Sequence, residues 1–182
     1  MNDFLDGRRK ALETSFFVQR DQELLAELRK DMTKESLAEL SGVSDAALLD
    51  RLIELGVSAE TLAALSLAPL VAVAWADGSI AENERDAILR SADEAGLSKG
   101  HEAYGLLVNW LEEKPPADFI SAWKEYSTEL AQQLDDAGRQ RLSETVLGRA
   151  RAVAEAAGGI LGMGAISPAE KAVLADLESA LA

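Results

Sequence analysis

The chain has 182 residues, of which 48% are apolar and 27% charged, a balance typical of a globular domain and unlike that of a disordered chain. Its net charge of −14 argues against a nucleic-acid partner, since phosphate binding requires clustered lysine and arginine. The absence of cysteine excludes disulfides, thiolate metal sites and thiol catalysis. Abundant alanine, leucine and glutamate, with only four prolines, favour an all-α fold.

The beginning of the chain carries no apolar export signal, because its first ten residues are mostly polar or charged. The apolar run between Glu60 and Asp77 contains Ser66 and Pro69. It is also shorter than the roughly 20 residues that a membrane span requires. We therefore expect a cytoplasmic protein without a membrane span.

Residues 3–32 are predicted to form a long amphipathic helix, and we treat residues 1–33 as an N-terminal arm beside a helical domain at 34–182. The apolar positions of the predicted helix at 3–32 recur at helical spacing: Leu5, Leu12, Phe16, Leu24, Leu28 and Met32. Such an arm packs either on its own core or against a partner helix, so a homodimer through this helix is one hypothesis. A break is expected at residues 33–35, with Thr33 as the N-cap of a short helix that ends near Gly42.

Further helices are predicted along the rest of the chain. Gly56 should end the helix at 44–55, Ser58 should cap a central apolar helix, and Pro69 should kink that helix or mark a joint in it. An acidic turn at Asp77 and Gly78 follows. The remaining predicted helices lie at 81–95, 98–113 and 117–134, from residue 135 through 153, and from Ser167 onward.

Two segments of the chain match at an offset of 86 residues. The matched pairs are Gly78 with Gly164, Ile80 with Ile166, Glu84 with Glu170, and Ile88 with Leu174. This repeat predicts two related helix–turn–helix units, at about 62–95 and 148–182, that cover each other's apolar faces. Small residues at 156–159 predict a close crossing with Ala68 and Ala72.

The acidic turn contains the candidate metal site. Residues 77–84 resemble the second half of an EF-hand loop, but Val73 and Trp75 occupy the first two ligand positions, so an EF-hand is rejected. A pair of carboxylates remains, Asp77 and Glu84, which one turn could bring together around a divalent cation such as calcium or magnesium. In the second unit Met163 replaces the acid.

Helix capping offers a competing interpretation of the same residues. Ser79 and Glu82 have the spacing of a capping box, which would satisfy free backbone N–H groups without any metal. Helix capping also explains Glu170, which is the third helical residue after Ser167, with Pro168 at the first position. Both interpretations stay open at this stage.

Enzyme motifs are not recognisable in this sequence. His101 is the only histidine, which excludes a multi-histidine site. The glycines at 158–164 have no following Lys-Ser/Thr and no preceding strand, so they form neither a P-loop nor a dinucleotide fingerprint. We predict a protein without catalytic activity. A hydrolytic enzyme that uses the acidic pair is kept as an alternative.

Two matching runs carry a family resemblance: Ala72-x-x-Trp75-Ala76-Asp77-Gly78-x-Ile80-x-x-x-Glu84 and Gly164-x-Ile166-Ser167-x-x-Glu170. They resemble the TerB-like family of tellurite-resistance proteins, to which the N-terminal region of certain membrane-anchored DnaJ-like co-chaperones is related. The resemblance covers about residues 62–182. It implies a helical bundle of two related halves, a metal site carried here by Asp77 and Glu84, and a cytoplasmic, non-catalytic protein of stress-response assemblies that binds other proteins. A purely structural oligomerisation protein is the remaining alternative.

Overall fold

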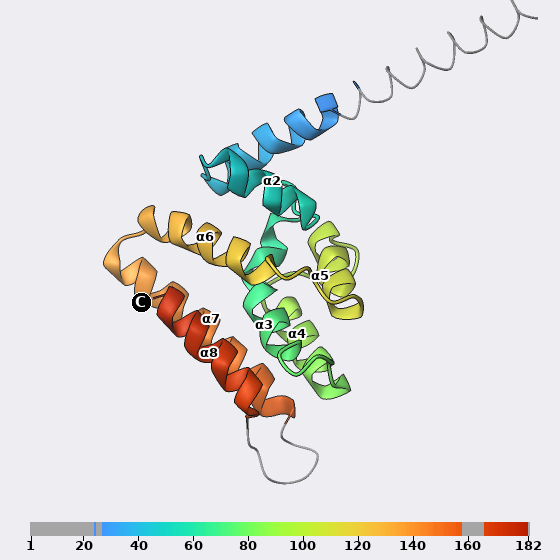
Figure 1. Ribbon diagram of the computed structural model, residues 1–182, viewed down its shortest axis with the longest axis vertical. Helices are drawn as coiled ribbons and strands as arrows, with labels where there is room; N and C mark the ends of the chain where they lie inside the picture. Colours follow the sequence, from blue (N-terminus) through green and yellow to red (C-terminus); the bar gives the residue numbers. More distant parts are fainter. Residues whose placement is uncertain (1–23, 25–26, 158–165, 182) are drawn as a thin grey trace, which may run out of the picture.

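The computed structural model describes residues 24, 27–157 and 166–181, and all regular structure within them is helical (Figure 1). This confirms the predicted all-α class. None of the described helices has the length and apolar character needed to cross a membrane. The helices are one at 27–41, α2 (Ala46–Glu54), the 3₁₀ helix η1 (Leu62–Leu67), α3 (Ala68–Ala74), α4 (Glu82–Glu94), α5 (Glu102–Glu112), α6 (Phe119–Gln132), α7 (Asp136–Ala157) and α8 (Pro168–Ala180).

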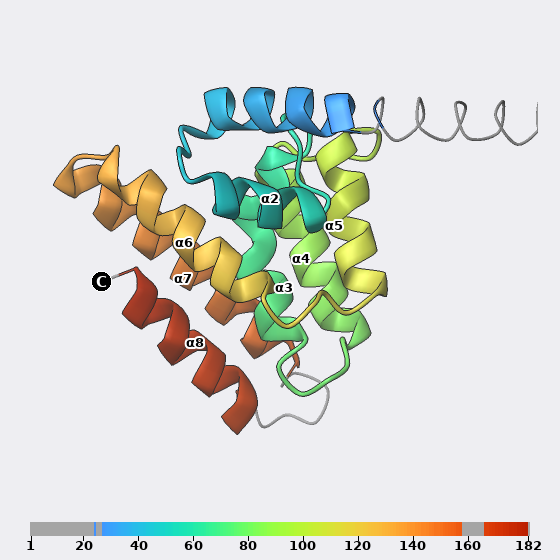
Figure 2. The same ribbon diagram turned by 45° about the horizontal axis from the view of Figure 1, so that its top comes forward.

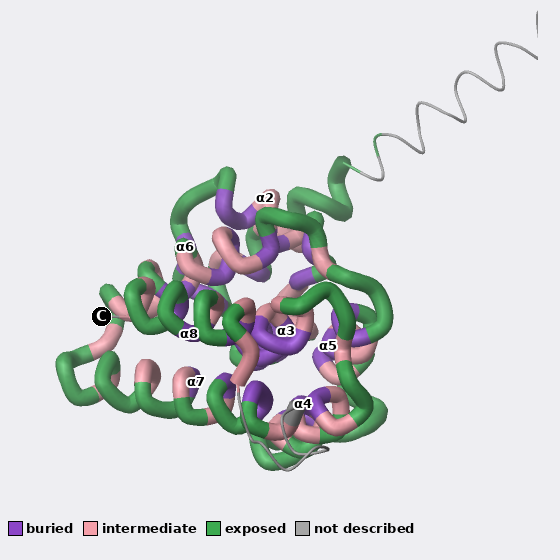
Figure 3. Tube along the Cα trace, turned by 60° about the horizontal axis from the view of Figure 1, so that its bottom comes forward, coloured by how far each residue is buried: buried purple, intermediate pink, exposed green. Residues whose placement is uncertain are grey.

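The apolar segment formed by η1 and α3 lies at the centre of the molecule. Most of its side chains are buried, and α3 is correspondingly purple in Figure 3. Pro69 marks the predicted joint, because the 3₁₀ turns end at Leu67 and Pro69 lies in the first turn of α3. A proline is tolerated there, since the first N–H groups of a helix have no intrahelical partner.

The longer helices pack around this centre on two sides (Figure 2). On one side α7 packs against α3, α4 and α8, and α6 packs against α2 and α3. On the other side α5 packs against η1, and α4 lies between the two sides, since it packs against both α3 and α7. Helices α3 and α7 contribute fully buried alanines at 68, 150 and 154, whereas the crossing predicted for residues 156–159 with Ala68 and Ala72 stays a prediction. Gly158 and Gly159 lie outside the described residues.

Two tryptophans fix the corner where α5 meets the end of α2. The indole N–H of Trp110 donates to the carbonyl of Leu55 over 3.2 Å, and the Trp110 ring packs edge-on against Phe119 at a centroid distance of 4.9 Å. Trp75, at the end of α3, donates to the carbonyl of Trp110 over 2.8 Å. These bonds satisfy the polar ends of large apolar side chains and tie α3 to α5.

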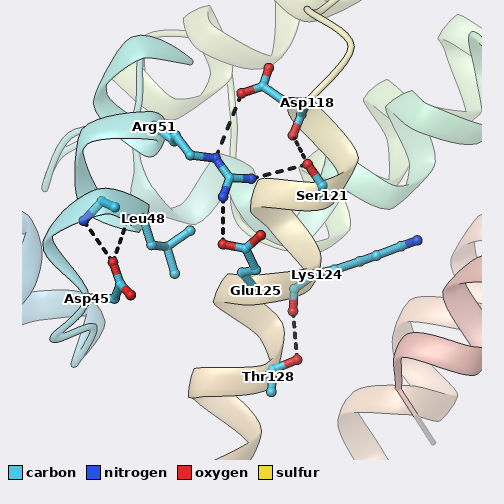
Figure 4. Close-up of polar contacts among 9 residues, drawn as sticks. Asp45, Leu48, Arg51, Asp118, Ser121, Lys124, Glu125 and Thr128 are labelled. Carbon is cyan, nitrogen blue, oxygen red and sulfur yellow. Dashed lines mark hydrogen bonds and ion pairs between the residues drawn. The ribbon is translucent and has the colours of Figure 1, made fainter.

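A polar cluster around Arg51 connects α2 to α6 (Figure 4). Its guanidinium contacts Glu125 at 2.6 Å, Ser121 at 3.2 Å and Asp118 at 3.8 Å. Asp45 caps α2 by accepting from the backbone N–H groups of residues 47 and 48. Because this cluster lies near the surface, it fixes the register of the two helices more than it adds stability.

The break predicted at residues 33–35 is wrong. The helix at 27–41 passes through these positions, and the hydroxyl of Thr33 donates to the carbonyl of Arg29 over 2.9 Å instead of capping a new helix. Threonine is compatible with a helix interior because its hydroxyl can bond the carbonyl four residues earlier. Gly42, with φ of +71°, follows the end of this helix. Residues 1–23 lie outside the described part of the chain, so the division into an arm and a domain stays a prediction.

Candidate functional site

The acidic turn lies between α3 and α4. Gly78 has φ of +97°, a left-handed conformation that glycine adopts without strain. A carboxylate oxygen of Asp77 accepts from the backbone N–H of Ser79 over 3.1 Å, which closes the turn locally. The turn is exposed at Asp77 and becomes half-buried at Ile80. Its geometry therefore directs the chain into α4 and leaves the Asp77 side chain exposed.

Glu84 is held inward at the first turn of α4. Its Oε2 accepts from the backbone N–H of Ala81 over 2.7 Å, and the side chain is only 4% exposed. The predicted capping box of Ser79 with Glu82 is wrong, because Ala81 takes the extended N-cap conformation and the helix begins at Glu82. Glu84 is consequently the third helical residue, the position from which glutamate reaches back to the N-cap.

The start of α8 has the capping arrangement that the sequence predicted. The hydroxyl of Ser167 accepts from the backbone N–H of Glu170 over 3.2 Å, and Oε2 of Glu170 accepts from the N–H of Ser167 over 2.6 Å. Pro168 occupies the first helical turn. Glu170 is 5% exposed, so α4 and α8 each begin with a buried glutamate.

The charge of Glu170 acts on Glu84, although the two glutamates are 86 positions apart in the chain. Burial raises the pKa of Glu84 above its ordinary value, and the bond from Ala81 N–H lowers it. The nearby charges of Glu170 and Asp77 raise this pKa further. Glu84 is thus influenced electrostatically by both Asp77 and Glu170, and a metal site at Asp77 and Glu84 stays a prediction. The 86-residue offset was the signal in the sequence that could have assigned Glu170 to the site.

Two buried oxygen atoms at this place have no hydrogen-bond partner among the described residues. They are Oε1 of Glu170 and Oδ1 of Asn83. The amide nitrogen of Asn83 is used, since it donates to the carbonyl of Ala156 in α7. A buried polar atom without a partner is costly, which makes each of these oxygens available to a ligand. Sequence analysis had not singled out Asn83.

The donor atoms collected here are carboxylate and amide oxygens. Oxygen donors suit hard divalent cations, calcium and magnesium in particular. Within the described ranges, however, no group of three or more histidine, aspartate or glutamate side chains is arranged to hold a metal ion. The carboxylates of Glu84 and Glu170 are the buried acidic groups of this region, and Asp77 is exposed in the turn. Comparison with known proteins finds no matching family model, no matching curated protein and no matching solved structure.

Proposed function

We propose that this chain is a non-enzymatic protein-interaction module of the TerB-like type that binds a divalent cation between the N-termini of α4 and α8. Glu84 and Glu170 are the central ligands, and Asp77 stands at the edge in the turn, because the three carboxylates of the described structure do not enclose an ion by themselves. The observation that carries the proposal is the Oε1 atom of Glu170, which is buried without a hydrogen-bond partner in the described structure. A cation would satisfy this oxygen.

The electrostatics of this region support a cation. Two like charges in a poorly solvated place oppose each other, and here the charge of Glu170 contributes to the raised pKa of Glu84. A divalent cation neutralises both carboxylates, and it needs no change in the hydrogen bonds that their other oxygens already accept. Capping and metal binding are therefore compatible functions of the same side chains.

The proposal includes a fold of two related helix–turn–helix units. Helices α4 and α8 each have 13 residues and begin 86 positions apart, as the sequence repeat requires. Ile88 and Leu174 are buried at equivalent positions, and Ile80 and Ile166 both pack against the core. These equivalences support a duplicated unit with a single cation site between the two copies. Gly164 and Met163 lie outside the described residues.

The bound cation would act on the structure rather than on a substrate. It would hold α4 and α8 together at the ends that face the central helix α3, which packs against both. Fixing these helices fixes the surfaces that they present to other proteins. An interaction role in a stress response, such as the tellurite response, is the biological setting that the TerB-like resemblance suggests for such a module.

Calorimetry with calcium, magnesium, manganese and zinc tests the cation site. We expect heat of binding and a rise in thermal stability with at least one of these ions, and we expect Glu84→Gln and Glu170→Gln to abolish both effects. Glu82→Gln is the matched control, because Glu82 is exposed at the same end of α4. Asp77→Asn should weaken binding. Absence of heat and of any thermal shift in the unmodified protein would refute the cation site.

A further inference from the structure

An apolar pocket lies between η1, α6 and α7. Its volume of about 480 Å³ falls in the range of roughly 300–1,000 Å³ that is usual for small-molecule sites. Helices α6 and α7 both pack against α3 and α8, so the core of the molecule holds the walls of the pocket in place (Figure 2). The apolar part of the lining includes Leu62, Leu65, Trp123, Leu130, Leu142 and Val146.

The lining of this pocket reaches from the core to the surface. Leu65, Trp123 and Val146 are buried, whereas Leu40, which also lines the pocket, is 64% exposed. Leu40 is thereby one of the large apolar side chains that the described structure leaves in water. A molecule with an apolar chain would remove part of this surface from water, which favours its binding.

A single charged side chain belongs to this apolar lining. Arg149, which is half-buried in α7, is the one charged residue among the described residues that line the pocket. None of them is an aspartate or a glutamate, although the chain contains 32 of these. Arg149 forms no ion pair within the described ranges, whereas Arg151 on the same helix pairs with Glu178 at 3.0 Å. Arg149 also lines the hollow between α4 and α7, so its guanidinium lies at the edge of the apolar pocket.

The hydroxyl of Tyr126 is a second polar group of the lining. It has no hydrogen-bond partner in the described part of the chain. Burial raises the pKa of Tyr126 above its ordinary value of 10.0, so the hydroxyl stays protonated at neutral pH. The lining serines are already engaged, because Ser66 and Ser127 each donate to a carbonyl of their own helix, over 2.8 and 2.9 Å. Arg149 and Tyr126 therefore offer donors to a negatively charged acceptor.

We propose that the pocket binds an apolar monocarboxylate of the fatty-acid class, with its hydrocarbon chain against η1, α6 and α7 and its carboxylate at Arg149. A planar guanidinium matches a carboxylate through two parallel hydrogen bonds. A single arginine in a chain of net charge −14 suits a singly charged carboxylate better than a doubly charged phosphate. The inference goes beyond the proposed function and does not depend on the cation site, which lies at the N-termini of α4 and α8.

Calorimetry with decanoate below its micelle concentration tests the site, with a chelator present to remove divalent cations. We expect saturable heat with decanoate and an affinity roughly tenfold lower for 1-decanol, because the neutral alcohol lacks the charge-assisted bonds to Arg149. Arg149→Met should reduce the affinity for decanoate by a similar factor, and Tyr126→Phe by a smaller one. Arg141→Met is the matched control, since Arg141 is exposed on α7 outside the pocket lining, and it should bind decanoate as the unmodified protein does.

Three results of the calorimetry would overturn the inference. The first is the absence of heat when decanoate is added to the unmodified protein. The second is equal affinity for decanoate and 1-decanol, which would identify a general apolar surface of the kind that accepts side chains of a partner protein. The third is an equal loss of affinity in Arg149→Met and Arg141→Met, which would show that only the overall charge of the protein attracts decanoate.

Tryptophan fluorescence locates the bound decanoate. Of the three tryptophans, Trp123 is the one that lines the pocket, whereas Trp75 and Trp110 donate to backbone carbonyls elsewhere. We expect decanoate to change the emission of the unmodified protein. In Trp123→Phe this change should disappear while the heat of binding persists. A change in emission that persists in Trp123→Phe would place decanoate elsewhere on the protein and would overturn the assignment of this pocket.

Discussion

The N-termini of α4 and α8 are capped by a glutamate in the same way, and they differ in the N-cap residue. Ala81 and Ser167 have nearly the same backbone conformation, with φ of −73° and −62° and ψ of 153° and 159°. In both helices a buried glutamate accepts from the N–H of this N-cap residue, but only Ser167 also caps with its own side chain. The comparison teaches that the glutamate is the common element, and that it is buried in both helices.

The two helices are also attached to α7 in different ways. Asn83 in α4 donates to the carbonyl of Ala156, whereas alanine occupies the equivalent position 169 in α8. Helix α8 instead has an exposed ion pair of Glu178 with Arg151, at 3.0 Å. An exposed pair of this kind contributes little to stability. We therefore expect α8 to depend more on its apolar contacts.

Removal of an equivalent core side chain from each helix should have the largest effect. Ile88→Ala and Leu174→Ala should each reduce the free energy of unfolding by about 2–5 kcal/mol, because both side chains are buried. Ile88, which is completely buried, should show the larger loss. Urea denaturation measures both, with the exposed Asp86→Ala as a control expected within about 0.5 kcal/mol of the unmodified protein. A neutral Leu174→Ala would show that α8 is not anchored as α4 is.

Loss of the buried glutamates should come next. Glu84→Ala and Glu170→Ala each leave a backbone N–H without its acceptor, which should cost about 1–3 kcal/mol. Glutamine retains an acceptor, so Glu84→Gln and Glu170→Gln should cost less than the alanine variants in the absence of a cation. Urea denaturation of the alanine and glutamine variants, without a cation, measures the difference. Equal losses for alanine and glutamine would contradict the capping role.

Exchange of the N-cap residues tests the difference in capping between the two helices. Ser167→Ala should destabilise the protein by about 0.5–2 kcal/mol, and Ala81→Ser should stabilise it by an amount at the lower end of that range. The gain is expected because the backbone at Ala81 already has the conformation of a capping serine. Thermal denaturation of both variants provides the measurement. A loss of stability in Ala81→Ser would show that the two helix starts are less equivalent than their backbones indicate.

The pH dependence should be the smallest effect and the most specific. The raised pKa of Glu84 means that the folded protein binds a proton here more tightly than the unfolded chain does. The charged form therefore destabilises the folded state at pH 7, and this destabilisation is relieved as the pH falls towards the ordinary carboxyl value of 4.5. The stability of the unmodified protein relative to Glu84→Gln should accordingly rise between pH 7 and pH 5. Parallel curves for the two proteins would contradict the raised pKa.

Local signals made much of the fold predictable. The spacing of apolar residues indicated helices throughout, Gly56 stops α2 with φ of +84°, and Pro69 marks the start of α3. The Ser-Pro-x-Glu run at 167–170 forms the capping arrangement that it predicted. Thr33 was misjudged because its hydroxyl can serve either a helix start or a helix interior, and spacing alone does not distinguish them.

The sequence by itself determined the all-helical class, most of the helix ends and the candidate acids Asp77 and Glu84, because these depend on residues within one or two turns of each other. Only the tertiary structure decided that Glu84 and Glu170 are buried, that the charge of Glu170 acts on Glu84, and that Asn83 contacts α7. Residues 86 positions apart can influence each other because α3 packs against both α4 and α8, and such packing depends on the whole core. The burial that raises the pKa of Glu84 has the same origin, since solvent is excluded by neighbours that are distant in the chain.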